Sequence, residues 1–279
     1  MRAPRIAART QAPERTPQGG NQSTDDLPIK PNSLPTTVRV GCAGWSIPKE
    51  HAERFPVEGT HLSRYAGCFR AVEINSSFYR PHRPATYARW AESVPDDFRF
   101  SVKMPKTATH ERRLANANEL LDRFIPEISA LGNKLGPLLV QLPPSLAFSA
   151  KVAETFFAAL RQRFSGDVAL EPRHPTWFEA EAEQLVTQFR VSRVAADPAV
   201  VEAASKPSGW DGLVYRRLHG SPKMYYSPYS AAYLETLSAA LSSAAESTAA
   251  WCIFDNTAEG FATANALELL AKIEASFDA

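Results

Sequence analysis

Cysteine is scarce in this sequence, and long apolar runs are absent from it. The three cysteines, Cys42, Cys68 and Cys252, are odd in number and show no CxxC spacing. We therefore expect buried, reduced thiols rather than a disulfide framework or a zinc knuckle, and a cytoplasmic setting. No apolar segment approaches the roughly 18–20 residues that a helix needs to span a bilayer, so we expect no membrane segment.

Net charge is nearly absent as well, because 31 Lys and Arg residues balance 30 Asp and Glu residues to leave +1. Such a balance gives no bulk reason to expect a nucleic acid or a membrane surface as the partner. The dense basic cluster of Lys103, Lys106, Arg112 and Arg113 around His110 is too small to change that expectation. No GxGxxG or Walker pattern follows any strand-like segment, so we expect no nicotinamide, flavin or nucleotide cofactor.

The first 36 residues differ in composition from the rest of the chain. They are rich in Pro, Gln, Ser, Asn and Thr, and Arg2, Arg5, Arg9 and Arg15 make them basic, without the apolar stretch of a secretory signal. We predict a disordered tail over residues 1–36, or alternatively a basic arm that touches nucleic acid or a partner. Residues 37–279 of a chain that is 44% hydrophobic are enough for one large domain.

Apolar runs that stop abruptly on a charged or amide side chain recur along this domain. Clear examples are VEINSSFYR (72–80), FSVKMPK (100–106), LLVQLPP (138–144), ALEPRHP (169–175) and VYRRLHG (214–220). Near-continuous apolar runs of this length are typical of strands in a parallel sheet that is buried on both faces. We predict eight strands, over residues 38–42, 71–74, 98–104, 138–142, 168–170, 193–196, 213–218 and 251–254.

Segments of helical pattern separate these strands. An alternation of strand and helix favours a parallel sheet, and eight units favour a single α/β domain closed into a (β/α)8 TIM-barrel-like fold. A doubly wound open sheet is the alternative, although it usually begins with a glycine-rich phosphate turn that this chain lacks. In a barrel the active site lies at the C-terminal ends of the strands. We predict helices over residues 61–67, 84–93, 116–131, 150–164, 178–189, 228–245 and 258–277.

Four side chains at these strand ends are the predicted catalytic groups: Glu73, Lys103, Glu171 and His219. Either carboxylate could act as an acid or base, with its pKa set by burial and neighbours, or could form a structural ion pair. Lys103 could hold a carboxylate, phosphate or carbonyl oxygen. A Schiff-base lysine is a lesser option, because the sequence does not show the apolar burial that it needs. His219 could transfer protons or simply satisfy hydrogen bonds.

Two arginines at strand ends suit an anionic ligand. Arg173 lies two residues after Glu171, so both project to the same face of an extended strand, either as a fixed pair or as a clamp beside an acid. Arg217 precedes the loop after the seventh predicted strand, where barrels often hold phosphate. Tyr225 and Tyr229 in that loop are candidate ligand contacts.

A divalent metal is the competing interpretation of the same acids. Glu73, Glu171, Asp197 and His219 could supply a mixed set of oxygen and imidazole ligands. The interleaved cations would repel a metal ion, and no HxH or HxxxH pair concentrates ligands on one element. We therefore predict no bound metal.

Sequence motifs in a fixed order resemble those of the YecE-like domain family. They are VGCAGWS, YAGCFRAVEINSSFYR, WAESVPDDFRFSVKMPKTATH, LLVQLPPSLAF, LEPRHPTWF, YRRLHG and FDNT, and they cover about residues 38–275. The resemblance implies a fold similar to the (β/α)8 type, but no reaction, because the function of that family is unknown. By matching blocks, it places on family motif positions Trp45, Glu73, Asn75, Tyr79, Lys103, His110, Gln141, Glu171, Arg173, Trp177, Arg217, His219 and Asn256.

The chain departs from this family pattern in three places. Cys42-Ala43 replaces the more usual small hydroxyl residues, Pro172 stands inside the LEPRHP block, and Asp255 occupies a position where an amide is common. None of these changes removes a charged residue of the predicted site.

Three classes of function fit these residues. The leading one is an enzyme that acts on a small anionic or sugar-like molecule by carboxylate acid/base chemistry with Lys and Arg clamps. The alternatives are a metal-dependent hydrolase or isomerase, and a non-catalytic module that binds a small ligand or nucleic acid. Nothing in the sequence sets the oligomeric state. The predicted substrate-binding residues are Trp45, Asn75, Tyr79, His110, Gln141, Arg173, Arg217, Tyr225, Tyr229 and Asn256.

Overall fold

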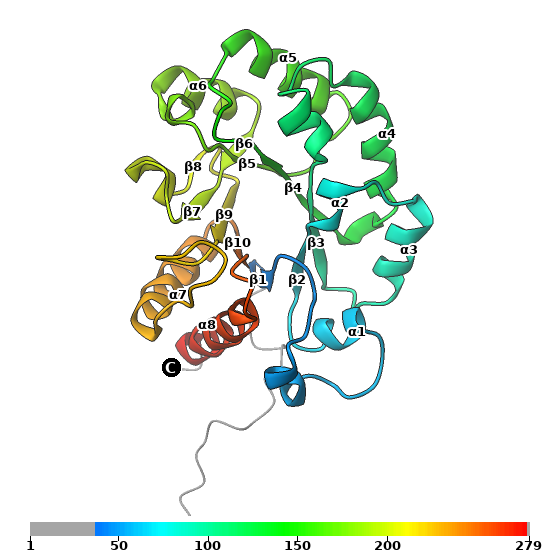
Figure 1. Ribbon diagram of the computed structural model, residues 1–279, viewed down its shortest axis with the longest axis vertical. Helices are drawn as coiled ribbons and strands as arrows, with labels where there is room; N and C mark the ends of the chain where they lie inside the picture. Colours follow the sequence, from blue (N-terminus) through cyan, green and yellow to red (C-terminus); the bar gives the residue numbers. More distant parts are fainter. Residues whose placement is uncertain (1–36, 278–279) are drawn as a thin grey trace, which may run out of the picture.

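The computed structural model describes residues 37–277, in which strands and helices alternate as an α/β fold (Figure 1). The predicted tail over residues 1–36 lies outside the described residues, so its disorder and the domain boundary at residue 37 stay predictions. The strands are β1 (Val38–Cys42), β2 (Ala71–Ile74), β3 (Arg99–Lys103), β4 (Leu135–Gln141), β5 (Val168–Glu171), β6 (Val191–Arg193), β7 (Ala195–Asp197), β8 (Ser208–Gly209), β9 (Leu213–Leu218) and β10 (Ala249–Phe254).

The helices lie outside the strands, which surround the centre of the molecule in Figure 1. Within residues 37–277, no helix combines the length and the apolar character needed to cross a bilayer. The α-helices are α1 (His61–Ala66), α2 (Ser76–Tyr79), α3 (Pro84–Glu92), α4 (Asn118–Ser129), α5 (Ala150–Arg161), α6 (Ala180–Gln188), α7 (Ala231–Ala245) and α8 (Phe261–Phe277).

The hydrogen-bonded strands form two parallel-rich sheets rather than one closed sheet. One has the order β1-β10-β9-β7 and the other the order β2-β3-β4-β5-β6-β8, with β6 and β8 as the antiparallel pair. The predicted strand at 193–196 is divided because Val194 interrupts it: β6 pairs with β5 and β7 pairs with β9. Strand β8 was not predicted, and its two residues carry too little pattern to be found.

The two sheets meet at two places. One is the break at Val194 between β6 and β7, and the other lies between β1 and β2. A single isolated bridge joins Ala43 to Glu73, and the amide of Gly44 donates to the carbonyl of Glu73 at 2.9 Å. Gly41 allows this approach, because a Cβ atom on it would overlap the carbonyl oxygen of Ala71. Contact between the two sheets therefore depends on a residue without a side chain.

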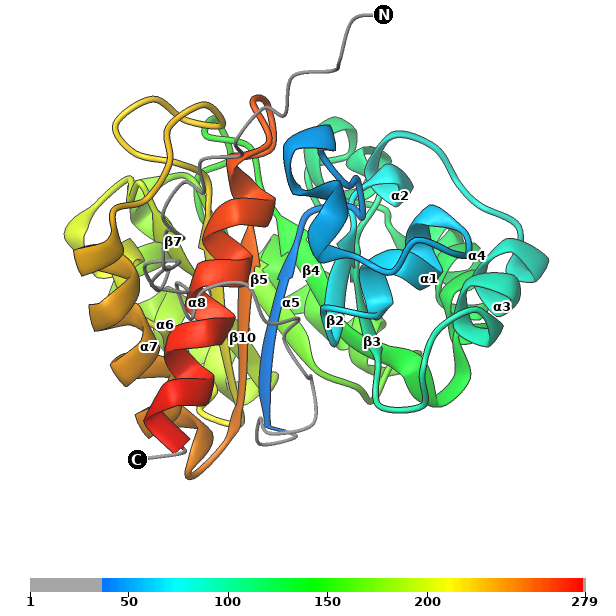
Figure 2. The ribbon, with the colours of Figure 1, turned by 90° about the horizontal axis from the view of Figure 1, so that it is seen from below.

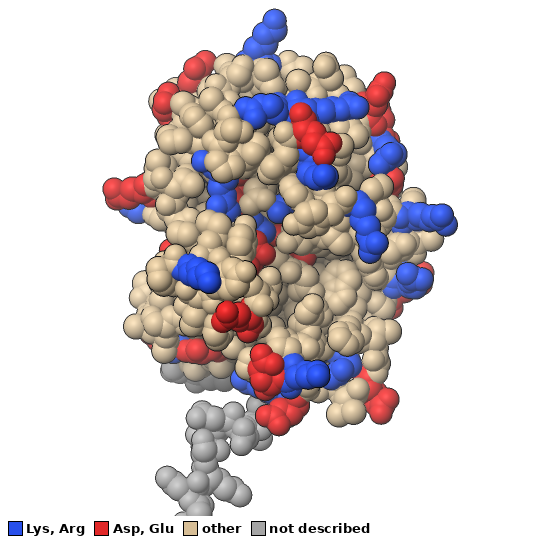
Figure 3. Space-filling view, in the orientation of Figure 1, with Lys and Arg blue, Asp and Glu red and all other residues tan. Residues whose placement is uncertain are grey.

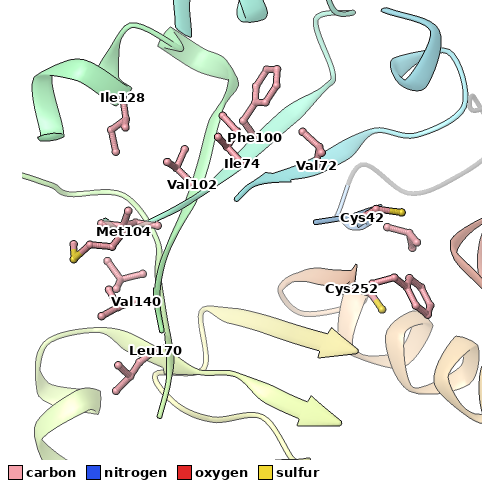
Figure 4. Packing of buried hydrophobic residues seen from close by; sticks show 14 of the residues in the cluster. Cys42, Val72, Ile74, Phe100, Val102, Met104, Ile128, Val140, Leu170 and Cys252 are labelled. Atoms are coloured by element: carbon pink, nitrogen blue, oxygen red, sulfur yellow. The ribbon is translucent and has the colours of Figure 1, made fainter. Parts of the chain in front are cut away.

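Successive strand residues point to opposite faces, and each face has its own apolar cluster. The larger cluster fills the space between strands and helices and includes Val72, Ile74, Phe100, Val102 and Leu170 (Figure 4). The smaller cluster lines the inner face of the strands, with Ala71, Leu139, Ala169, Tyr215 and Ile253 among its members.

Two residues beyond each of these inner apolar positions, the same strand face becomes polar. Ala71 is followed by Glu73, Leu139 by Gln141, Ala169 by Glu171, Tyr215 by Arg217 and Ile253 by Asp255. The spacing of two keeps every polar side chain on the inner face, at the C-terminal end of its strand. Loops that follow β9 and β10 lie on the same side of the molecule (Figure 2).

Candidate functional site

Arg217 lies at the centre of the inner polar cluster, with no solvent exposure. Its Nε and Nη2 donate to the two carboxylate oxygens of Glu73, at 3.0 and 2.6 Å. Its Nη1 donates to Glu171 at 2.7 Å, and Nη2 also donates to Asp255 at 3.0 Å. One guanidinium from β9 thus holds carboxylates from β2, from β5 and from the end of β10.

The charges of this cluster stabilise one another. Burial alone would lower the pKa of Arg217, but Glu73, Glu171 and Asp255 raise it well above its ordinary value. Burial likewise opposes ionisation of Glu171, yet Arg217, His219 and Arg173 hold the pKa of that carboxyl well below its usual range. The pKa of Asp255 is also lowered, because Arg217 and His219 outweigh its burial. Arg217, Glu171 and Asp255 are therefore charged at neutral pH.

His219 bridges two of the acids and is fully buried. Its Nδ1 lies 3.0 Å from Oδ2 of Asp255, an acceptor, so that nitrogen carries a proton. Its Nε2 lies 2.9 Å from Oε1 of Glu171 and 2.8 Å from Nη2 of Arg173. Arg173 itself contacts Glu171 at 2.5 Å. The imidazole therefore stands between an acid and a cation at Nε2, with a second acid orienting its other nitrogen.

Two further side chains complete the hydrogen bonding of the carboxylates. Tyr215 donates to Glu73 at 3.0 Å and contacts the hydroxyl of Ser101 at 2.8 Å. Gln141 donates to Glu171 at 3.2 Å. Sequence reasoning missed Tyr215, although it lies two residues before Arg217 and so faces the same side.

Asp255 was also missed as a site residue, because the sequence presented it only as a departure from the family pattern. The signal was available: it is the first polar residue after β10 and continues the inner face of that strand. Only Oδ2 of its carboxylate is engaged, by Arg217 and His219. Among residues 37–276, no side chain or backbone group hydrogen-bonds to Oδ1.

Lys103 ends β3 and is 6% exposed. Its Nζ lies 4.3 Å from the centre of the Phe78 ring, and within the described residues no carboxylate or carbonyl oxygen binds it. Burial lowers the pKa of Lys103, and Arg217 adds to this effect against the opposing pull of Glu73 and Asp255. His110 packs its ring edge-on against the same Phe78 ring at 4.9 Å.

The structure places other predicted ligand contacts away from this centre. The hydroxyl of Tyr229 accepts from Gly220 and donates to Asp197, each at 2.9 Å, which fixes the loop after β9. The amide nitrogen of Asn256 donates to the carbonyl of Ser227 at 3.0 Å. These residues support the backbone of the site.

Aromatic and amide candidates lie along the rim. Tyr225 packs edge-on against His219 at 5.9 Å and is 41% exposed. Tyr79 is 70% exposed. Trp45 packs against Trp90 at 5.0 Å and borders a hollow of about 270 Å³ with Asn75. The Oδ1 atom of Asn75 is buried and has no hydrogen-bond partner in the described part of the chain.

The acids do not assemble as a metal site. Across residues 37–276, no group of three His, Cys, Asp or Glu side chains is arranged to hold a metal ion. Asp197, one of the four ligands considered, hydrogen-bonds to Tyr229, while the carboxylates of Glu73 and Glu171 face Arg217. The carboxylates at the centre of the site are arranged around the guanidinium of Arg217.

Comparisons with known proteins agree on one family. The family model described as "Protein of unknown function DUF72" matches residues 39–279. The UPF0759 protein YecE of Escherichia coli K12 is 34% identical over 173 residues, which is 60% of this chain and 61% of that protein. The UPF0759 protein YunF of Bacillus subtilis is 27% identical over 152 residues, 50% of this chain and 52% of its own length. The matched segments thus span about half to three fifths of these relatives.

Solved structures share the fold. A DUF72 family protein from Thermotoga maritima has a TM-score of 0.70 at 24% identity, covering 85% of this chain and 99% of that one. A DUF72 family protein from Enterococcus faecalis has a TM-score of 0.70 at 21% identity, covering 85% and 95%.

Proposed function

This chain belongs to the DUF72 family of proteins of unknown function, and we propose that it is an enzyme acting on a small anionic or sugar-like molecule. The proposed site is the polar end of the inner strand face. We further propose that the two sheets act together as a (β/α)8 TIM-barrel-like fold. Support comes from their junctions: β6 runs into β7 through Val194, and Ala43 bridges Glu73. In such a fold, catalytic groups gather where these polar residues lie.

One observation carries the proposal: a buried cation stands at the site without an acid bound to it. Lys103 is 6% exposed, and its amine contacts an aromatic ring but, among the described residues, no oxygen. A buried charge without a partner is costly, and an anionic or carbonyl oxygen of a ligand would supply the missing partner. Space for a ligand is visible in Figure 3, where acidic and basic atoms lie in a hollow at the centre of this face.

Proton transfer in this proposal belongs to His219 and Glu171. The two groups lie 2.9 Å apart, and Asp255 orients the imidazole from the other side at 3.0 Å. Nη2 of Arg173 lies 2.8 Å from Nε2 of His219. An anion that draws this guanidinium to itself would leave Nε2 free to exchange a proton with the substrate, as a hydrolase or isomerase requires.

Glu73 takes a supporting role in this scheme. Both of its oxygens are occupied, by Arg217 at 2.6 and 3.0 Å and by Tyr215 at 3.0 Å, and the side chain has no solvent exposure. Its charge holds Arg217 in place, which in turn keeps Glu171 ionised. Glu171→Gln is accordingly expected to abolish turnover through chemistry, and Glu73→Gln through displacement of Arg217.

The burial of three unpaired cysteines supports a reducing location. Cys42, Cys68 and Cys252 are all free thiols and all buried. We therefore keep the cytoplasm as the proposed location.

Ligand-induced thermal stabilisation tests the proposal. Inorganic phosphate, glycolate, glycerol 3-phosphate and gluconate are the probes, and a bound ligand raises stability by RT ln(1 + [L]/Kd). We expect at least one probe to stabilise the protein, and Lys103→Met to lose that effect. Lys106→Met is the matched control, because Lys106 is 48% exposed and already paired with Glu111. If no probe stabilises the protein, or if Lys103→Met responds like the control, the site does not bind anions through Lys103.

A further inference from the structure

Two lysines of the described chain are buried, and their surroundings differ. Lys134 is 8% exposed, and its ammonium donates to the carbonyls of Ala91 and Val94 at 2.8 and 2.6 Å. Asp96 adds an ion pair at 3.6 Å. The three N–H donors of Lys134 therefore face three oxygen partners. Lys103, at 6% exposure, has none of these oxygen partners within residues 37–276.

The surroundings of Lys103 suit a neutral amine. The face of Phe78 gives the amine a cation–π contact in place of an oxygen partner, and Arg217 places a second positive charge close enough to disfavour the ammonium. Burial, the largest influence, acts in the same direction on its pKa, and the nearby acids only partly offset it. Desolvation and an adjacent cation are the two conditions that turn a lysine into a nucleophile.

A proton acceptor stands beside this amine. The ring of His110 packs edge-on against Phe78, the ring that Lys103 also contacts, with 4.9 Å between ring centres, and its Nδ1 is hydrogen-bonded to the hydroxyl of Thr109 at 2.9 Å. Burial and the charge of Lys103 lower the pKa of His110, so its imidazole is neutral at pH 7. No hydrogen bond from the described residues occupies Nε2 of this ring.

From this geometry we propose that Lys103 is a nucleophile that forms an imine with an aldehyde or ketone group of the substrate. The inference rests on the proposed function and narrows its substrate class to carbonyl compounds that carry an anionic group or hydroxyls. Arg173 binds the anionic group in this arrangement, and His110 moves the protons.

The step balances without any added reagent. His110 takes a proton from the ammonium of Lys103, and the neutral amine attacks the carbonyl carbon. A C–N bond forms, the π electrons move to oxygen, and a proton passes from nitrogen to that oxygen to give a carbinolamine. The nitrogen lone pair then expels the hydroxyl group, which leaves as water with the proton returned by His110. The product is an iminium ion, with the same charge as the original ammonium.

Reductive trapping tests this inference against a matched pair of ligands. The intact protein is incubated at pH 7 with glyoxylate or dihydroxyacetone phosphate and cyanoborohydride, and labelled lysines are located by peptide mass mapping. Glycolate and glycerol 3-phosphate are the controls, because they carry the same anions but no carbonyl group. We expect one reduced adduct on Lys103 from at least one carbonyl probe, and none on Lys134 or on exposed Lys106.

Lys103→Arg separates the two proposals. This variant keeps the positive charge, so we expect it to retain thermal stabilisation by glycolate or glycerol 3-phosphate while it loses the adduct completely. Stabilisation of the wild-type protein without any adduct would overturn the imine and leave the anion site standing. Labelling of Lys106 to the same extent as Lys103 would also overturn it. Absence of both stabilisation and adduct would remove the proposed function together with the inference.

Discussion

Replacing Arg217 by methionine is the sharpest test of how this site is held together. The change removes a guanidinium that forms four hydrogen bonds to carboxylates, on Glu73, Glu171 and Asp255, at 2.6 to 3.0 Å. Methionine fills a similar volume without charge, so the main loss is electrostatic. Three acids then remain buried, with only Arg173, Lys103 and His219 near them.

The expected loss follows from the burial of both partners. Removing one member of a buried ion pair costs about 3–5 kcal/mol, because the other charge stays buried and uncompensated. Arg217 and Glu73 have no exposure, and Glu171 has 1%, so solvent does not screen these pairs. We therefore expect about 3–5 kcal/mol near pH 7.5, which corresponds to a fall of ~2–4 °C in Tm per kcal/mol for a domain of this size.

The loss depends on pH with a definite sign. In the native protein the pKa values of Glu171 and Asp255 are lowered, so these acids stabilise the fold above their unfolded pKa and lose that contribution as pH falls. In Arg217→Met, burial is no longer opposed by the guanidinium, and the pKa of each acid rises. Protonation then removes uncompensated negative charge from the variant. Its loss of unfolding free energy relative to the wild type is therefore smaller at pH 5 than at pH 7.5.

Urea unfolding followed by tryptophan fluorescence at the two pH values measures this difference. Arg123→Met is the control, since Arg123 is 63% exposed in a helical pair with Glu127, and such pairs contribute about 0.3–0.5 kcal/mol. Adding Glu73→Gln to Arg217→Met removes one uncompensated charge and should restore stability, although Glu73→Gln alone destabilises the native protein. An equal deficit at both pH values, or no rescue in the double variant, would refute the electrostatic account.

Two other substitutions and one labelling experiment test neighbouring features. Tyr215→Phe leaves a buried carboxylate and a buried hydroxyl each short of one hydrogen bond, and urea unfolding should show a loss of about 1–3 kcal/mol; a loss below ~0.5 kcal/mol would contradict the assigned bonds. Gly41→Ala forces a methyl group against the carbonyl of Ala71, so thermal denaturation should show a large drop in Tm, and an unchanged Tm would contradict the close contact of β1 and β2. Burial raises the pKa of Cys42 and of Cys252 to about 12, so a thiol reagent at pH 8 should label them only after denaturation.

Much of the fold could be predicted because strands and helices of this chain have distinct apolar patterns. The strands over 71–74 and 213–218 were predicted with the bounds that the structure shows, and the helix predicted at 84–93 is Pro84–Glu92. A proline in the first turn of the helix and near-continuous apolar runs on the strands are local signals, which sequence reasoning can use.

Closure of the strands could not be predicted from the same signals. Whether one sheet or two results depends on hydrogen bonds between distant segments, such as the single bridge from Ala43 to Glu73. The interruption at Val194 is equally invisible, because that residue is apolar and buried like its neighbours. The periodicity of apolar residues shows which face of a strand each residue occupies. Whether the hydrogen bonds between neighbouring strands continue without a break depends on the tertiary structure.

For the candidate site, too, the sequence predicted which residues lie together but not what each of them binds. Strand ends identified Glu73, Glu171 and Arg217 as neighbours, and the structure brings all three into direct contact. Their separate roles could not be predicted, since spacing does not show that Arg217 uses four of its five N–H donors on acids and that its Nη1 also lies 3.4 Å from Nε2 of His219. The substrate-binding role of Arg217 thus stays a prediction that its contacts do not favour.

The position of Lys103 determines how the charged side chains of the site balance one another. Sequence reasoning counted three cations against two or three acids and inferred an anionic ligand from the excess. The structure adds Asp255 as a third acid, which removes the excess: Arg217 and Arg173 bind acids directly, and Lys103 supplies the last balancing charge from a distance. An iminium ion on Lys103 is as positive as the ammonium that it replaces. A carbonyl compound that bonds to the amine therefore leaves the positive charge of Lys103 opposite the three acids.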